Sequence, residues 1–212
     1  MDSERRQEND EKRRLPLHPE PENLSDRKLP FAQEPPTCWF RFHKPHRDAL
    51  HFGKSSAFRF DDPEGVFGVL YVAAEVRGAF AETFLGDLVA ARYISHKGFA
   101  ERILSEVRCR EPLRLVDLTG KGANLLGADS RLHSTGDRVT QRWSQALYLH
   151  PETPDGILYR SRIDDSCLCA AIFDRDPSRF SSTATGSLLE SHHSATLREL
   201  AELYQLCLLG DS

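Results

Sequence analysis

Alternating apolar and polar side chains predict several β-strands after the N-terminal segment. Over residues 38–43 the alternation puts Trp39 and Arg41 on one face of a strand and Phe40 and Phe42 on the other. A short, nearly continuous apolar run, which is typical of a strand covered on both faces, follows at 69–73, and further strands are expected at 113–118, 156–160 and 167–173.

Helical spacing of apolar residues marks other segments. Over 76–86 it places these residues on one stripe: Val76, Ala79, Phe80, Thr83 and Phe84. We also expect one helix over 97–108, a second that begins at a capping box formed by Ser134 and Asp137, and a closing helix over 194–209. Residues 119–124 are expected to form a turn. Several strands are too close in sequence for helical crossovers, so we predict an α+β fold with a mixed or antiparallel sheet flanked by helices.

The composition changes sharply near residue 37. Residues 1–30 hold 15 charged side chains, eight acidic and seven basic, and six of the twelve prolines fall within 16–36. Such a segment has too little apolar surface to offset the entropy of ordering. We therefore predict that 1–37 is a disordered tail that can be removed, or alternatively an arm that orders on a partner, and that 38–212 is one folded domain.

Composition and charge exclude several classes of protein. The 212-residue chain has a net charge of −4, whereas proteins that bind nucleic acid through phosphates usually carry a basic surplus. No run of 18 apolar residues is present, so we expect no membrane span. Five scattered cysteines, an odd number, fit a reducing compartment, and we expect a cytoplasmic protein.

Familiar site motifs are absent. The glycines of 120–127 have the wrong spacing for a dinucleotide fingerprint, and no Walker A motif or Gly-x-Ser-x-Gly elbow occurs. Cys167 and Cys169 lie in an apolar strand and are interpreted as buried thiols, while His192 and His193 are interpreted as an exposed loop. We therefore predict no metal site.

Polar residues inside apolar segments are the informative ones, because their burial costs free energy unless they are paired or used. Arg59 stands before a turn, Tyr71 is central in a strand, and Glu82 lies at the edge of the helical stripe. Ser161 ends a strand, and Arg41 is the polar group of the first strand. Without further information, each could be a structural residue.

Together these segments resemble the RES-domain family, named for its Arg, Glu and Ser. The resemblance covers residues 39–177 and rests on four parts in order: Arg59 before Pro63-Glu-Gly65, Tyr71 in Val-Leu-Tyr-Val-Ala, Ala79-Phe-Ala-Glu82, and Gly156-Ile-Leu-Tyr-Arg-Ser161. The chain departs from the family where members commonly read Gly-Arg-Trp-Asn, since it has Phe58-Arg-Phe-Asp61.

The resemblance implies a fold like that of ADP-ribosyltransferase catalytic domains, with NAD⁺ as the substrate. It implies that Glu82 stabilises positive charge at the ribose, that Arg59 grips phosphate or ribose, and that Tyr71 packs on nicotinamide or ribose. Ser161 would orient the substrate, and Arg41 is a further candidate for binding it.

Three functions stay open at this point. The first is NAD⁺ degradation by a glycohydrolase or phosphorylase, which in this family is commonly the toxin of a bacterial toxin–antitoxin pair. The second is ADP-ribosyl transfer to a protein, and the third is a non-catalytic binding module. The implied partner is an antitoxin with a helix-turn-helix domain; whether the chain forms a homo-oligomer stays open.

Overall fold

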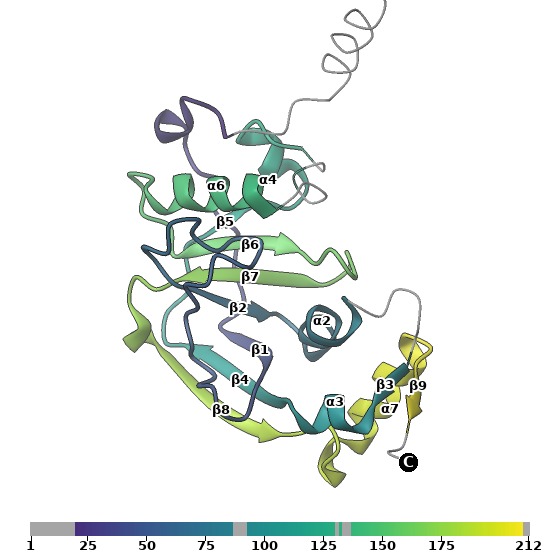
Figure 1. The fold of residues 1–212 in the computed structure, drawn as a ribbon. Helices are drawn as coiled ribbons and strands as arrows, with labels where there is room; N and C mark the ends of the chain where they lie inside the picture. Colours follow the sequence, from purple (N-terminus) through teal and green to yellow (C-terminus); the bar gives the residue numbers. More distant parts are fainter. Residues whose placement is uncertain (1–19, 87–92, 130–131, 133–136, 210–212) are drawn as a thin grey trace, which may run out of the picture.

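A computed structural model describes residues 20–86, 93–129, 132 and 137–209, and shows one curved, mixed sheet (Figure 1). Its seven strands have the order β5-β6-β7-β2-β1-β4-β8. Neighbouring strands are antiparallel except β5 and β6, which are parallel. The strands are β1 (Cys38–His43), β2 (Val69–Ala73), β4 (Ile103–Cys109), β5 (Leu115–Asp117), β6 (Gly156–Arg160), β7 (Leu168–Phe173) and β8 (Phe180–Gly186).

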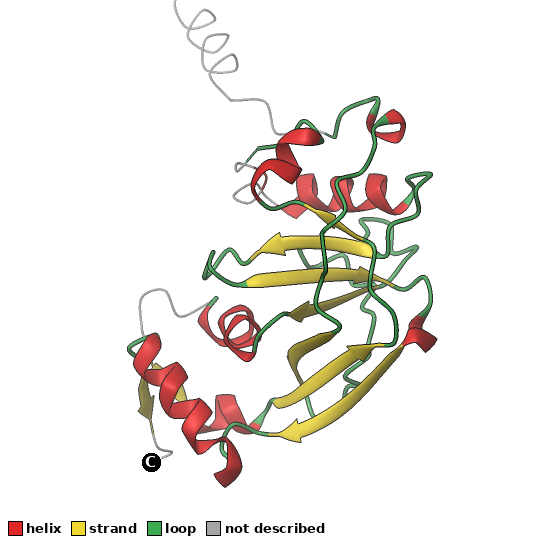
Figure 2. Cartoon of the chain, turned by 180° about the vertical axis from the view of Figure 1, so that it is seen from behind, coloured by secondary structure: helices red, strands yellow, loops and turns green. Residues whose placement is uncertain are grey.

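Helices lie at both ends of this sheet and against its middle (Figures 1 and 2). Helices α4 and α6 contact β5 and β6, and α2 contacts β1 and β2. Helix α7 lies near a small parallel sheet of β3 (Tyr93–Ser95) and β9 (Cys207–Leu209). The helices are α2 (Val76–Phe80), the π-helical turn η2 (Ala81–Leu85), α3 (His96–Ala100), α4 (Gly120–Leu125), α6 (Asp137–Tyr148) and α7 (Ser194–Leu203), with short 3-10 turns η1 (Leu24–Asp26), η3 (Pro177–Arg179) and η4 (Ser191–His193).

Both faces of the central strands are covered by apolar side chains. In β2, Val69 and Ala73 belong to one core cluster, while Leu70 and Val72 belong to a second cluster that also contains Trp39. Because alternate residues of a strand point to opposite faces, a strand buried on both sides needs a nearly continuous apolar run. The α+β fold with a mixed sheet and flanking helices is thus confirmed.

The predicted helix over 97–108 is wrong. Helix α3 ends at Ala100, and the next residues form β4, which pairs with both β1 and β8. The alternation of Ser105, Val107 and Cys109 with Leu104, Glu106 and Arg108 gives the strand its two faces. Pairing on both edges outweighs the helix propensity of the isolated segment.

Other local predictions also need correction. Residues 120–124 are helical in α4, and Gly122 is required there, because a Cβ at this position would lie 2.1 Å from the carbonyl oxygen of Asp117. The predicted closing helix ends at Leu203, and β9 follows. Strand β8 was missed because an edge strand rich in Ser and Thr has no apolar alternation. His193 is buried rather than exposed, and Ser134 lies outside the described residues.

The structure contradicts a tail that extends to residue 37. Leu24 and Leu29 are buried, and the Leu29 N–H donates to Glu152 Oε1 at 2.8 Å. Residues 30–32 run along the free edge of β5, where Ala32 N donates to Leu115 O and Asp117 N donates to Pro30 O. Two well-placed leucines and these hydrogen bonds make residues 20–37 part of the folded domain; residues 1–19 lie outside the described residues.

Candidate functional site

The sheet opens between β1 and β2, and the gap forms a cavity of about 460 Å³. These two strands pair only through Phe40 and Ala73, whereas β1 pairs with β4 along its whole length. Side chains of both strands therefore line the cavity. Residues of the chain that connects the two strands line it as well. Arg41, Arg59, Tyr71 and Glu82 all lie at this cavity, so the structure brings four of the five predicted site residues together.

A buried carboxylate shapes the loop that carries Arg59. Asp61 Oδ2 accepts hydrogen bonds from the N–H groups of Ala57 and Phe58 at 3.1 Å each and from Ser55 Oγ at 3.0 Å. Asp61 Oδ1 accepts a hydrogen bond from the Tyr71 hydroxyl at 3.0 Å. One side chain thus satisfies four donors and holds the loop in a single conformation.

Helix α6 fixes the same loop from the opposite side. Gln141 Nε2 donates to the carbonyl oxygens of Ser56 and Phe58 at 2.9 and 3.0 Å. Ser144 Oγ donates to the carbonyl oxygen of Phe60 at 2.7 Å. The loop backbone is therefore anchored both by the sheet and by a helix.

Arg59 points its guanidinium into the protein, and only 5% of the residue is exposed. The group lies 4.8 Å from the centre of the Phe60 ring and 5.4 Å from that of Tyr159, and Nη2 donates to Leu132 O at 3.3 Å. Burial lowers the pKa of Arg59 from its usual value, and the carboxylate of Glu82 is close enough to act in the opposite sense. Arginine keeps its proton even so, which places a fixed positive charge at the cavity wall.

The hydroxyl of Tyr71 is used within the protein. It donates to Asp61 and accepts a hydrogen bond from the Phe60 N–H at 2.8 Å. Burial and then the charge of Asp61 raise the pKa of Tyr71 well above its ordinary value, so the phenol stays neutral. The ring, rather than the hydroxyl, is available to a ligand.

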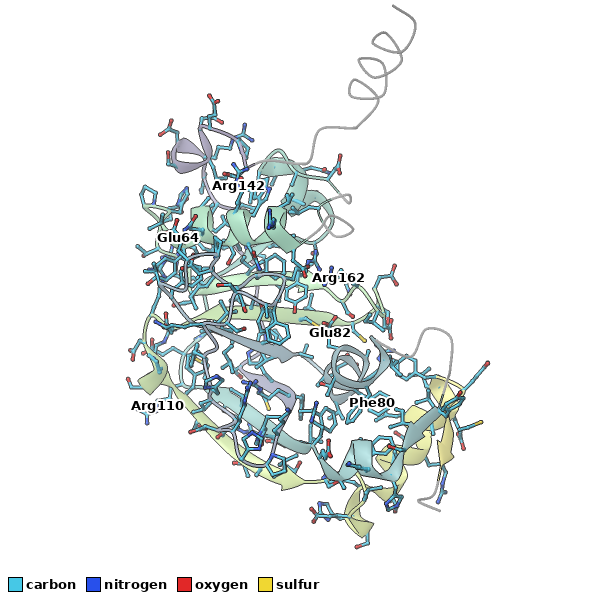
Figure 3. The ribbon with its side chains drawn as sticks, viewed as in Figure 1. Glu64, Phe80, Glu82, Arg110, Arg142 and Arg162 are labelled. Atoms are coloured by element: carbon cyan, nitrogen blue, oxygen red, sulfur yellow. The ribbon has the colours of Figure 1, made fainter. Side chains whose placement is uncertain are left out.

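Glu82 lies on the π-helical turn η2, directly after α2, with its side chain exposed at the cavity. Single π-helical turns are rare and frequently occur at functional sites, because they change the direction of a side chain on an otherwise regular helix. Glu82 and Arg162 both lie on the side of the sheet where α2 packs (Figure 3).

Arg41 lies on the first strand and reaches across the gap. Its Nη1 donates to the carbonyl oxygens of Ala49 and His51 at 3.0 and 3.3 Å. Its buried Nε has no hydrogen-bond partner among the described residues. Burial lowers the pKa of Arg41 to about 10, which still leaves it protonated near neutral pH.

Comparison with known proteins identifies the family. The model of the RES domain matches residues 38–195. The chain belongs to the RES-domain family. Over 99 residues it is 36% identical to "Probable toxin y4kH" of Sinorhizobium fredii strain NGR234, a match that covers 44% of this chain and 76% of that protein.

A solved structure has the same fold. It is a chain of the crystal structure of the M. tuberculosis MbcT–MbcA toxin–antitoxin complex, with a TM-score of 0.59 and 18% sequence identity. The alignment covers 86% of this chain and 98% of that chain.

Ser161 of this RES domain does not lie at the cavity. Its Oγ accepts hydrogen bonds from the N–H groups of Ile163 and Asp164 at 3.1 and 3.2 Å. These bonds stabilise the turn between β6 and β7 that carries Arg162, a cavity residue. In this structure, Ser161 acts on the cavity only through that turn.

The sequence reasoning missed most of the cations of the cavity. Among the described residues, the cationic side chains that line it are Arg41, Lys44, Arg47, Lys54, Arg59, Arg102 and Arg162, and the carboxylates are Asp61 and Glu82. Two of the missed residues, Lys44 and Arg47, lie in the connection after β1, which also contains His46 and His51. This local run of basic residues was the available signal, and it gives the lining of the RES-domain cavity a surplus of positive charge.

Two further observations concern other kinds of site. Among residues 20–86, 93–129, 132 and 137–209, no group of three His, Cys, Asp or Glu side chains is placed to hold a metal ion. Within the same residues, every helix is too short or too polar to cross a membrane.

Proposed function

We propose that this RES domain binds NAD⁺ and cleaves the bond between nicotinamide and ribose. The observation that carries the proposal is the cavity itself, which seven described cationic side chains line together with one exposed carboxylate, Glu82. A dinucleotide presents a pyrophosphate that suits the cations and a ribose that develops positive charge when nicotinamide leaves. The cationic side chains match the pyrophosphate of such a ligand, and the carboxylate matches its ribose.

In the proposed reaction, the bond between C1′ of ribose and the nicotinamide nitrogen breaks, and its electron pair leaves with neutral nicotinamide. The ribose carbon passes through an oxocarbenium-like state that Glu82 stabilises electrostatically. Water or phosphate then forms the new C1′–O bond, giving ADP-ribose or its phosphate ester, and a proton is released to the solvent or to Glu82.

The other cavity residues bind and position the substrate. The guanidinium of Arg59, held against two aromatic rings at the cavity wall, supplies a fixed positive charge that attracts phosphate oxygens. Arg41 also lines the cavity and carries a protonated guanidinium, with which it binds a phosphate oxygen there. Tyr71 contributes its ring, and Ser161 acts by holding the turn that carries Arg162.

Product analysis tests this function and separates the alternatives. Purified protein is incubated with NAD⁺ labelled in its adenosine part, with and without phosphate. We expect nicotinamide together with ADP-ribose, or with its phosphate ester if phosphate is the acceptor. Label on a macromolecule would instead make the chain an ADP-ribosyltransferase. Unchanged NAD⁺ under all conditions would leave only a non-catalytic binding module and overturn the proposal.

We also propose that the chain is the toxin of a toxin–antitoxin pair and acts in the cytoplasm. A relative named as a probable toxin and the fold shared with a chain of a toxin–antitoxin complex support the first part. All five cysteines are free thiols, which supports a reducing compartment. The partner would be a helix-turn-helix protein that presents a carboxylate or C-terminus to the cationic cavity.

Expression in a bacterium tests the toxin proposal. We expect the wild-type domain alone to lower intracellular NAD⁺ and arrest growth, and the Arg59→Ala and Glu82→Ala variants to do neither. Free growth with normal NAD⁺ in cells that accumulate the wild-type domain would overturn this proposal.

A further inference from the structure

An exposed aromatic ring stands at the wall of the cavity. The Phe58 side chain lines it although 58% of the residue is exposed to solvent. The side chain next in sequence, Arg59, is buried at the same cavity. Ligand sites combine aromatic surface with a few fixed polar groups in this way.

The backbone of Phe58 is held rigidly on both sides. Its N–H donates to Asp61 Oδ2 at 3.1 Å, and its carbonyl oxygen accepts from Gln141 Nε2 at 3.0 Å. The backbone that carries the exposed ring is therefore held in one conformation. A pre-organised contact surface loses little entropy when a ligand binds.

A second ring completes the surface. Phe58 and Tyr71 meet edge to face, with ring centres 5.8 Å apart and planes at 62°, and we call this pair the aromatic wall. Since the hydroxyl of Tyr71 is held by Asp61 and Phe60, its ring cannot turn away. Because 58% of Phe58 is exposed at the cavity, the ring offers surface to a planar group of a ligand whose charged part meets the cations.

We propose that Phe58 stacks on one heteroaromatic base of the bound dinucleotide, and that it determines affinity for that base. The inference rests on the proposed function and adds a contact to it. The shared chemistry is stacking on a planar base, and that base is either nicotinamide or adenine.

Equilibrium binding tests the contact. Dissociation constants are measured calorimetrically for NAD⁺, for ADP-ribose, which lacks nicotinamide, and for nicotinamide mononucleotide, which lacks adenine. All proteins carry Glu82→Gln so that the ligands are not consumed. Phe58→Ala is compared with Phe58→Tyr, which keeps the ring, with Phe58→Leu, which keeps apolar bulk only, and with the matched control Leu149→Ala, since Leu149 is 73% exposed and lies outside the cavity lining.

We expect Phe58→Ala to weaken NAD⁺ binding about 5- to 100-fold, the range typical for loss of one stacking ring. The loss should extend to only one of the two fragments, which identifies the stacked base. Phe58→Tyr should restore affinity, and Leu149→Ala should leave it unchanged. Thermal denaturation should show every variant folded, because the backbone contacts of the loop remain.

Three results would overturn the inference alone: NAD⁺ binding unaffected by Phe58→Ala, binding restored fully by Phe58→Leu, or an equal loss for both fragments. Failure of the protein carrying Glu82→Gln alone to bind NAD⁺ and both fragments would overturn the proposed function, and the inference with it.

Discussion

Replacing Asp61 by alanine should release the loop that carries Arg59. The carboxylate is 1% exposed and accepts four hydrogen bonds, two of them from the backbone N–H groups of Ala57 and Phe58. The hydroxyls of Ser55 and Tyr71 can turn to other acceptors or to water, but the two N–H groups are fixed in place. Each buried donor left without an acceptor costs about 1–3 kcal/mol, so we expect Asp61→Ala to lower the free energy of unfolding by about 2–6 kcal/mol.

Asp61→Asn is the matched control, because its carbonyl oxygen can replace Oδ2 and its amide can donate to the Tyr71 hydroxyl. We expect this variant to lose less than Asp61→Ala, about 1–3 kcal/mol, since it keeps the hydrogen bonds from Ala57, Phe58 and Ser55 and removes only the acceptor of the Tyr71 O–H. In a domain of this size, 1 kcal/mol corresponds to about 2–4 °C in the melting temperature.

Denaturant unfolding and hydrogen exchange check this reasoning together. Exchange at the Ala57 and Phe58 amides should accelerate in Asp61→Ala and stay slow in Asp61→Asn. If Asp61→Ala unfolds within about 1 kcal/mol of the wild type and these amides stay protected, then Asp61 does not hold the loop.

Three further outcomes are expected. Glu82→Gln should lower NAD⁺ turnover about 10²- to 10³-fold at an unchanged melting temperature, and turnover at the wild-type rate would exclude Glu82 as the charge-stabilising group. Leu29→Ala should cost about 2–5 kcal/mol in denaturant unfolding, whereas a surface leucine would show almost no effect. Hydrogen bonds from Ser166, Tyr204 and Cys167 lower the pKa of Asp164 to about 2. The wild type should therefore be more stable than Asp164→Asn above about pH 4 and lose that advantage as the pH falls to 2. A difference in stability that stays constant across this range would show that the ionised carboxylate of Asp164 does not stabilise the fold.

The local spacing of apolar residues was enough to predict the elements that are packed against the core. The apolar run at 69–73 and the helical stripe at 76–86 predicted β2 and the α2–η2 helix, because burial of these side chains imposes a fixed period on the sequence. The same reasoning failed at 97–108 and 180–186, which pair with each other as β4 and β8. Strand pairing depends on a partner distant in sequence, and neither segment alone carries that information.

For the site, the order of motifs identified residues, and the tertiary structure decided what each one does. Arg59, Tyr71 and Glu82 were found from the family pattern and Arg41 as the polar residue of the first strand, and all four lie at one cavity. Ser161 was found in the same way, yet its hydroxyl is used in the turn after β6.

The sequence by itself determined the alternation of strands and helices, the α+β class and the family, because each depends on local periodicity or on the order of motifs. Only the tertiary structure decided that β1 and β2 separate after one residue pair, that seven cations face the resulting cavity, and that residues 20–37 close the β5 edge. These features arise from contacts between segments distant along the chain, and such contacts leave no regular pattern in the sequence of either segment.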